Sequence, residues 1–287
     1  MISDASQTIA MALSEASQEA RASRLEAEVL LAHTLNCSRS HLYTWPEQHL
    51  TEQQSQTFSS LIGRRLAGEP IAYITGTREF WSLTLSVTPD TLIPRPETEL
   101  MVERSLEILQ TKPTARIADL GTGSGAIAAA LASELPESQI TATDNSVKAL
   151  SVAQANFEDL GLQNIQTSLG HWLTALPNAE PFDLILCNPP YVAEYDPHLQ
   201  EDGLPWEPAS ALVSGKDGLD DIRQLIKNAP LCLAPQGWLI LEHGFDQGSA
   251  VRQLFSEAGY QEVITHHDLE QRERLTEGRR PIDDGNC

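Results

Sequence analysis

The chain has 287 residues, 41% of them hydrophobic and 21% charged, a composition that predicts a globular protein with enough apolar side chains to build a core. Its formal net charge of −21 argues against a nucleic-acid partner, because proteins that bind a phosphate backbone usually carry a basic patch. No apolar run approaches the roughly 20 residues that span a bilayer, so we expect no membrane partner.

The N-terminus and the cysteines favour the cytoplasm. Residues 1–5 lack the basic start and the apolar segment of a secretory signal. The cysteines are Cys37, Cys187, Cys232 and Cys287. They lie far apart and form no Cys-x-x-Cys pair, so we expect free thiols, no zinc or other metal site, and a cytoplasmic location.

Residues 1–75 are predicted to form a small all-helical domain. Apolar residues such as Leu61 and Ile62 recur at helical spacing, and Thr51 is placed to cap a new helix. This part of the chain contains no obvious catalytic cluster. Residues 76–92 are expected to link it to the rest through a β-hairpin, and we place the two strands of the hairpin at 71–76 and 80–87.

Residues 93–287 are predicted to form the second, larger domain. A helix is expected over 100–109, with Pro96 in its first turn. We then expect strands at 117–120, 139–143, 164–169, 182–187 and 237–242, helices at 126–134, 147–160, 222–232 and 250–258, and a closing hairpin formed by 262–265 and a segment near Arg279. This alternation predicts an α/β fold with a doubly wound, Rossmann-like sheet.

A glycine loop, Gly121-Thr122-Gly123-Ser124-Gly125, lies between the first of these strands and its helix. Its spacing differs from the Gly-x-Gly-x-x-Gly of dinucleotide enzymes, which favours a nucleoside carrying an amino-acid tail over a pyrophosphate. Asp144 ends the next strand, where a carboxylate can accept hydrogen bonds from both hydroxyls of a ribose. Asp119, just before the loop, is a candidate to orient the loop or an ammonium group.

The segment Asn188-Pro189-Pro190-Tyr191 follows the apolar strand at 182–187. Neither proline has an N–H to donate, so strand pairing must stop at Asn188. The carboxyl edge of a parallel sheet is where ligands bind in such folds. A planar amide held there is suited to recognise another planar hydrogen-bonding group, although the segment is also compatible with a simple end of a strand.

Four segments together resemble one family. They are Ile93-Pro94-Arg95-Pro96-Glu97-Thr98-Glu99, residues 119–128 around the glycine loop, Asn188-Pro189-Pro190-Tyr191, and Leu241-Glu242-His243-Gly244. They are similar to the release factor glutamine N5-methyltransferases, known as PrmC or HemK, which are class I S-adenosylmethionine (SAM) methyltransferases. The domain order of that family, a helical domain, a hairpin linker and a catalytic domain, matches the order expected here and covers nearly the whole chain.

The resemblance implies roles for individual residues. Binding of SAM, and of the product S-adenosylhomocysteine, would involve Gly121, Thr122, Gly123, Ser124, Gly125, Asp144, Trp172 and Asn188. Binding of the substrate would involve Asn188, Pro189, Pro190 and Tyr191, and catalysis would involve Asn188, Pro189 and Tyr191. His171 stands where the family commonly has an acidic residue, and Glu270 stands where relatives tend to have glycine.

The implied reaction is transfer of a methyl group to the side-chain amide of the glutamine in a Gly-Gly-Gln loop of class I peptide-chain release factors, which act in translation termination. An amide nitrogen is a poor nucleophile, so we expect the Asn188 side-chain oxygen and the Pro189 carbonyl to accept hydrogen bonds from its two N–H groups. Tyr191 would stack on the amide. The sequence identifies no proton acceptor.

Other readings of the same residues stay open. A ribosomal-protein glutamine is a close alternative substrate, and the exocyclic amine of a flipped DNA or RNA base suits the same Asn-Pro-Pro-Tyr segment. The net charge of −21 and the Pro-Arg-Pro-Glu segment argue against the nucleic-acid substrate. A SAM-binding protein that has lost catalysis is a third reading.

Overall fold

The computed structural model describes residues 7–19, 23–176, 180–201 and 203–282. The chain divides into two compact units, one containing Met1–Gly76 and Glu201–Trp206, the other Thr77–Gln200 and Glu207–Cys287. Cys287 lies outside the described residues; Cys37, Cys187 and Cys232 are free thiols. In the part of the chain that the structure describes, no helix is both long enough and apolar enough to cross a bilayer.

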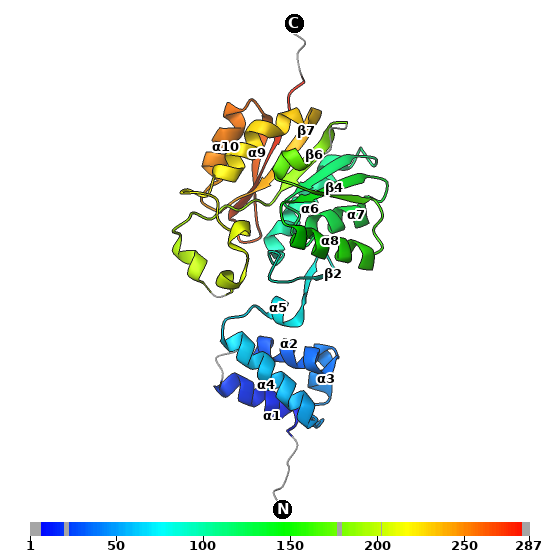
Figure 1. Cartoon of the computed structure of the whole chain (residues 1–287), viewed down its shortest axis with the longest axis vertical. Helices are drawn as coiled ribbons and strands as arrows, with labels where there is room; N and C mark the ends of the chain where they lie inside the picture. The colour runs from blue at the N-terminus through cyan, green and yellow to red at the C-terminus, as the bar shows by residue number, and fades with distance from the viewer. Residues whose placement is uncertain (1–6, 20–22, 177–179, 202, 283–287) are drawn as a thin grey trace, which may run out of the picture. The chain divides into compact units, whose positions relative to one another are not determined.

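The first unit is helical, as the sequence predicts. Its described helices are α1 Ile9–Glu19, α2 Arg24–Leu35, α3 Arg39–Thr44, α4 Glu52–Leu66 and α5 Ile71–Thr75 (Figure 1). The expected cap at Thr51 is confirmed, because its side chain accepts the Gln54 N–H while the Gln54 side chain accepts the Thr51 N–H. Such a capping box satisfies two donors that a helix start leaves unpaired.

The strand predicted at 71–76 is wrong, because this segment forms α5. Pro70, at φ −60°, precedes the helix, and its carbonyl accepts the N–H groups of Tyr73 and Ile74. Gly76 ends it at φ 75°. The β-propensity of these residues is overridden because the helix buries Ala72, Tyr73 and Ile74.

The hairpin is formed instead by β1 Thr77–Phe80 and β2 Leu83–Ser86. The strand predicted at 80–87 is therefore wrong at its start, because Phe80 ends β1 and the turn follows it. Its two turn residues, Trp81 and Ser82, both have positive φ, 52° and 58°, which is the backbone of a tight two-residue hairpin turn. The hairpin residues belong to the second compact unit and not to the first, helical unit.

The second unit is built on a seven-stranded sheet with the order β5-β4-β3-β6-β7-β9-β8. Its strands are β3 Arg116–Leu120, β4 Gln139–Asp144, β5 Ile165–Leu169, β6 Phe182–Cys187, β7 Leu233–Glu242, β8 Gln261–His267 and β9 Glu273–Arg279. The five strands β3 to β7 pair in parallel, and β8 and β9 form the antiparallel closing hairpin that the sequence predicts. The strand order reverses between β3 and β6, where a doubly wound sheet opens a crevice.

Helices cover both faces of this sheet (Figure 1). One face packs against α6 Glu99–Leu109, α7 Ala126–Glu134 and α8 Val147–Asp159, the other against α9 Asp220–Asn228 and α10 Gly248–Glu257. The helix expected over 222–232 stops at Asn228 and continues as a 3-10 turn, Ala229–Leu231, because Pro230 has no N–H for a further helical bond. The predicted α/β fold, with its helical N-terminal domain and hairpin, is otherwise confirmed.

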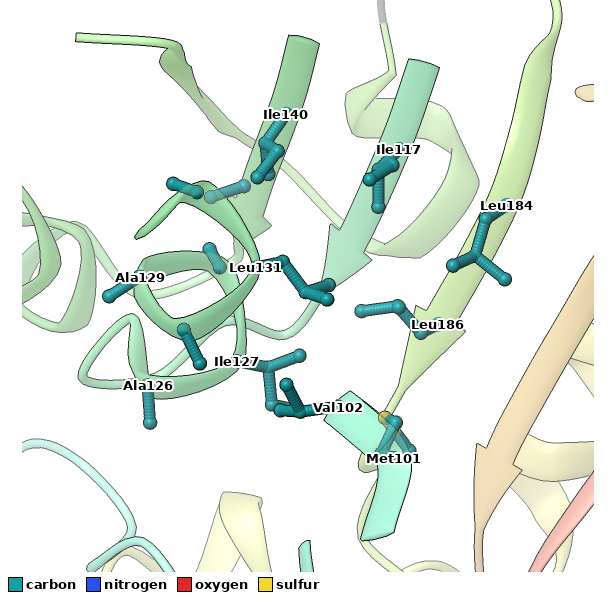
Figure 2. Packing of buried hydrophobic residues seen from close by; sticks show 14 of the residues in the cluster. Met101, Val102, Ile117, Ala126, Ile127, Ala129, Leu131, Ile140, Leu184 and Leu186 are labelled. Atoms are coloured by element: carbon teal, nitrogen blue, oxygen red, sulfur yellow. The ribbon is translucent and has the colours of Figure 1, made fainter. Parts of the chain in front are cut away.

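The core beneath the glycine loop is built from buried hydrophobic side chains. Figure 2 shows α7 over the strands that carry Ile117, Ile140 and Leu186, with Ile127 and Leu131 pointing into the shared core. Burying each such side chain stabilises the fold by roughly 1.5–3 kcal/mol. The other α7 residues are mostly alanines, so the helix lies close to the sheet and its first turn is held at the carboxyl edge of β3.

Candidate active site

A cavity of about 310 Å³ lies at the carboxyl edge of the sheet, within the second unit. The segments that follow β3, β4, β5 and β6 all contribute to its lining, which includes Gly121, Asp144, Trp172 and Asn188. Most of the site residues predicted from the sequence line this cavity: Gly121, Thr122, Gly123, Ser124, Asp144, Trp172, Asn188 and Pro190. Gly125, Pro189 and Tyr191 are not among its lining residues.

The glycine loop follows β3 with Gly121, Gly123 and Gly125 at φ 71°, 57° and 84°. A Cβ on Gly121 would lie 2.8 Å from Cζ3 of Trp172, too close for any side chain at this position. A Cβ on Gly123 would meet nothing within 4 Å. The loop is therefore closed against Trp172 on one side and leaves open space beside Gly123.

Asp144 connects the loop to the end of β4. Its Oδ2 accepts the Gly123 N–H at 3.0 Å, and its Oδ1 accepts the Ser146 N–H at 2.8 Å. A carboxylate has about four lone-pair sites, so each oxygen can accept a further hydrogen bond from a ligand hydroxyl in the cavity. These two backbone bonds hold the carboxylate in place before a ligand arrives.

Trp172 is held by contacts that no motif in the sequence predicts. Its indole Nε1 donates to Asp221 Oδ1 at 2.9 Å, and Asp221 Oδ2 accepts the Ser214 hydroxyl at 2.6 Å. Trp172 has φ 46°, and the ring of its neighbour His171 packs edge-on at 5.4 Å. His171 also lines the cavity, where it places an imidazole ring beside Trp172.

Asn188 lies half-buried at the end of β6 and joins a chain of hydrogen bonds. Its Nδ2 donates to Thr98 Oγ1 at 3.3 Å, and the Thr98 hydroxyl donates to Glu242 Oε2 at 2.7 Å. The phenol of Tyr191 donates to the other oxygen of Glu242 at 3.3 Å. Thr98 and Glu242 stand in segments that carry the family resemblance, but their link to Asn188 is visible only in the fold.

Glu242 is 3% exposed, and this burial raises its pKa to about 7. Burial also raises the pKa of Tyr191, with a smaller contribution from the Glu242 charge, so the phenol keeps its proton at neutral pH. The Tyr191 backbone carbonyl accepts from Gln247 Nε2 at 2.9 Å, and a Cβ on Gly218 would collide with that carbonyl. Tyr191 is thus fixed through both its main chain and its side chain.

Asp119 is fully buried under the glycine loop. Its Oδ2 accepts the Thr122 hydroxyl at 2.6 Å, which ties the carboxylate to the loop, as expected for a residue that orients it. No described residue pairs with its Oδ1. Burial raises its pKa to about 7.

Arg95, which lines the cavity, is held by Glu207, a second contact that no motif in the sequence predicts. Arg95 Nη2 lies 2.5 Å from Glu207 Oε1, and Oε2 of the same carboxylate accepts the Ile93 N–H at 3.0 Å. Glu207 is 7% exposed. Its bonds join the Pro94-Arg95 segment to the segment containing Pro208 and Ser210, and both segments line the cavity.

These features fit SAM. The open space beside Gly123 can accept the backbone of an amino-acid tail, the fixed Asp144 carboxylate suits a ribose diol, and Trp172 offers an aromatic face for adenine. Among the described residues, no group of three or more His, Cys, Asp or Glu side chains is placed to hold a metal ion.

Comparisons with known proteins support the same assignment along both units. Residues 4–76 match the family described as PrmC N-terminal domain, and residues 98–201 match the family described as Methyltransferase small domain. A structure of a methyltransferase from Pyrococcus furiosus is 18% identical and covers 78% of this chain and 100% of its own, with a TM-score of 0.51. At this identity the likeness concerns the fold alone.

Full-length relatives are much more similar. The release factor glutamine methyltransferase of Xylella fastidiosa (strain Temecula1) is 49% identical over 261 residues, 91% of this chain and 94% of the relative. The enzyme of the same name from Escherichia coli (strain K12) is 47% identical over 262 residues, with the same coverage of 91% and 94%. The chain belongs to the release factor glutamine methyltransferase family.

Proposed function

We propose that the protein transfers a methyl group from SAM to the side-chain amide nitrogen of the glutamine in the Gly-Gly-Gln loop of class I release factors. The observation that carries this proposal is the Asn188 amide, whose nitrogen is bound to Thr98 and whose oxygen accepts from no described residue, in the cavity that Asp144 and the glycine loop line. Near-full-length identity of 49% and 47% to enzymes of that name supports the choice of substrate.

The methyl donor brings the reactivity, because the methyl group on its sulfonium is strongly electrophilic. The chain supplies binding and orientation. Asp144 would accept hydrogen bonds from the ribose, and Trp172 would line the adenine side. The backbone of Gly121-Thr122-Gly123-Ser124-Gly125 would surround the methionine tail, with Asp119 beneath the loop.

Asn188 and Pro189 would orient the acceptor. The substrate amide has two N–H groups in one plane, and the Asn188 Oδ1 and the Pro189 carbonyl are two acceptors on adjacent residues. Accepting both N–H groups favours the positive charge that develops on nitrogen and aligns the nitrogen with the methyl group. Pro190 lines the cavity, and Tyr191, held by Glu242, would pack on the amide plane.

The helical unit would contribute to recognition of the release factor, which is a macromolecular substrate. Trp45 is 52% exposed on this unit, and exposed tryptophans are frequent anchors in protein interfaces. In the full chain, Trp45→Ala is expected to raise the KM for the release factor several-fold and to leave SAM binding unchanged. An unchanged KM would count against this role for Trp45.

The central test is Asn188→Ala, assayed with purified release factor and SAM, with mass spectrometry of the peptide that contains the glutamine. We expect kcat/KM to fall by about 100-fold or more, as for other oriented hydrogen-bond groups, while the Kd for SAM changes by only a few-fold. Asn228→Ala is the matched control, since among the described residues the Asn228 side chain donates to the carbonyl of Gln224 on its own helix and does not reach the cavity. Turnover near wild type, or methylation of duplex DNA and not of the factor, would overturn the proposal.

A further inference from the structure

The hydrogen bonds of Glu242 determine which end of the Asn188 amide faces the cavity. An ionised carboxylate can only accept hydrogen bonds. Thr98 has one hydroxyl proton, and its 2.7 Å bond to Glu242 Oε2 uses it. Thr98 Oγ1 can then only accept from Asn188, so the group 3.3 Å away must be the Asn188 NH₂ and not its oxygen.

The opposite orientation would prevent Asn188 from accepting a hydrogen bond from the substrate amide. If the Asn188 NH₂ faced the cavity, it would present donors to the two N–H donors of the acceptor amide, and the contact would be repulsive. A neutral Glu242 would permit this, because a protonated carboxyl can donate to Thr98 and free the Thr98 proton for the Asn188 oxygen. The charge on Glu242 is therefore what selects the useful orientation.

We propose that Glu242 is a positioning residue, acting through Thr98 to hold the Asn188 amide with its oxygen toward the cavity. The proposal rests on the proposed function, in that Asn188 is taken there as the acceptor for the substrate amide. It adds two residues to the machinery, Thr98 as the relay and Glu242 as its anchor. The Tyr191 hydroxyl donates to the second oxygen of Glu242. One carboxylate therefore holds Tyr191 directly and Asn188 through Thr98, which are the two ends of the Asn-Pro-Pro-Tyr segment.

The surroundings of Glu242 place its titration in the neutral range. The hydrogen bonds from Thr98 and Tyr191 and, less strongly, the charge of Arg274 on β9 favour its charged form, and Glu97 disfavours it. The phenol of the partly buried Tyr191 and the buried thiol of Cys187 also lie within electrostatic reach of this carboxyl group. Burial outweighs these effects and raises the pKa of Glu242 to about 7. The Asn188 orientation should therefore be lost progressively as the pH falls below 7.

The first experiment reads the orientation without any acceptor substrate. In the full chain, the side-chain NH₂ signal of Asn188 is followed by ¹H–¹⁵N NMR between pH 5.5 and 8.5, after assignment by its loss in Asn188→Asp. We expect it to shift with a midpoint near 7 and to show an NOE to the Thr98 methyl group above that pH. In Glu242→Gln the titration is expected to vanish. A signal that does not respond to pH, or that responds equally in Glu242→Gln, overturns the proposal.

The second experiment uses the methyltransferase assay. Thr98→Val removes the relay hydroxyl at nearly constant volume and is expected to lower kcat by about 10- to 100-fold, with the Kd for SAM within twofold of wild type. Thr98→Ser keeps the hydroxyl and is expected to retain kcat within about threefold. In the wild type, kcat is expected to rise between pH 6 and 8 as Glu242 loses its proton. Glu242→Gln is expected to abolish this rise. Wild-type kcat in Thr98→Val would overturn the relay.

Glu277→Gln provides the matched control. Glu277 is another buried carboxylate of the same sheet, 1% exposed, and it pairs with Arg104 and His266 and not with Thr98. Its loss is expected to leave both the Asn188 titration and the pH profile of kcat in place. The NMR experiment also separates the two proposals: a chain that does not methylate release factor but shows the Asn188 titration refutes the function and supports the positioning.

Discussion

Glu207 holds Arg95 by a 2.5 Å contact between Oε1 and Nη2, although the two residues lie 112 positions apart in the chain. The same carboxylate also accepts the Ile93 N–H. Two segments that line the cavity are therefore joined by one buried side chain. This contact determines where Arg95, which belongs to one of the segments that carry the family resemblance, stands at the cavity.

Replacing Glu207 should impair use of the release factor more than binding of SAM. Glu207→Gln can still accept the Ile93 N–H but loses the charge opposite Arg95, and Glu207→Ala loses both. We expect the KM for the factor to rise in the order wild type, Gln, Ala, by about tenfold for Ala. The alanine leaves the N–H of the buried Ile93 without its partner, which costs about 1–3 kcal/mol, so we expect the segment that carries Arg95 to shift at the cavity. Steady-state kinetics and SAM titration measure this. The exposed Glu137→Ala is the control, and equal KM values across the series would contradict the prediction.

Gly125 should be far less replaceable than Gly161. Both have positive φ, 84° and 69°, but a Cβ on Gly125 would lie 2.5 Å from Cε1 of Phe157, whereas a Cβ on Gly161 would meet nothing within 4 Å. Gly161→Ala is expected to cost only the backbone strain, about 1–2 kcal/mol, and Gly125→Ala a further 1–3 kcal/mol or so of overpacking. Urea denaturation gives both free energies of unfolding. Equal losses would show that Phe157 can move aside without cost.

Asp144→Asn is expected to weaken SAM binding by about 10- to 100-fold. The substitution places an NH₂ where one of two backbone N–H groups now donates, so either the Gly123 or the Ser146 contact must be lost. It also removes an acceptor from the cavity. Calorimetric titration with SAM measures the effect, and the exposed Asp159→Asn controls for the change in net charge. A Kd within twofold of wild type would exclude Asp144 from the binding site.

Asp119 should make the ligand-free protein less stable as the pH rises toward 7. Its pKa is raised from 3.8 to about 7, so between these values the native state keeps a proton that the unfolded chain has released. The free energy of unfolding therefore falls with rising pH, by up to about 1.4 kcal/mol per pH unit from this group. Asp119→Asn carries no such charge, so its stability relative to wild type should rise between pH 4 and 7. Urea denaturation of both proteins across this range tests it, and a constant difference would contradict the raised pKa.

Several features of this protein follow from the chemistry of residues that are neighbours in the chain. The helix at Ala126–Glu134 and the strand at Phe182–Cys187 have the bounds that their apolar patterns predict. The two prolines after Asn188 end strand pairing wherever the strand lies, since they have no N–H. The closing hairpin and the alternation of strands and helices likewise follow from residues near one another in the chain.

Other features depend on contacts between residues that are distant in the chain. Residues 71–75 form a helix because burial outweighs their strand propensity. The anchors of the site are polar residues whose partners lie far away in sequence: Thr98 is 144 positions from Glu242 and 90 from Asn188. A buried carboxylate acquires its role from the donors that the fold places around it, and no local pattern specifies those donors. The Asn-Pro-Pro-Tyr segment marks the site in the sequence, but packing alone sets the orientation of its amide.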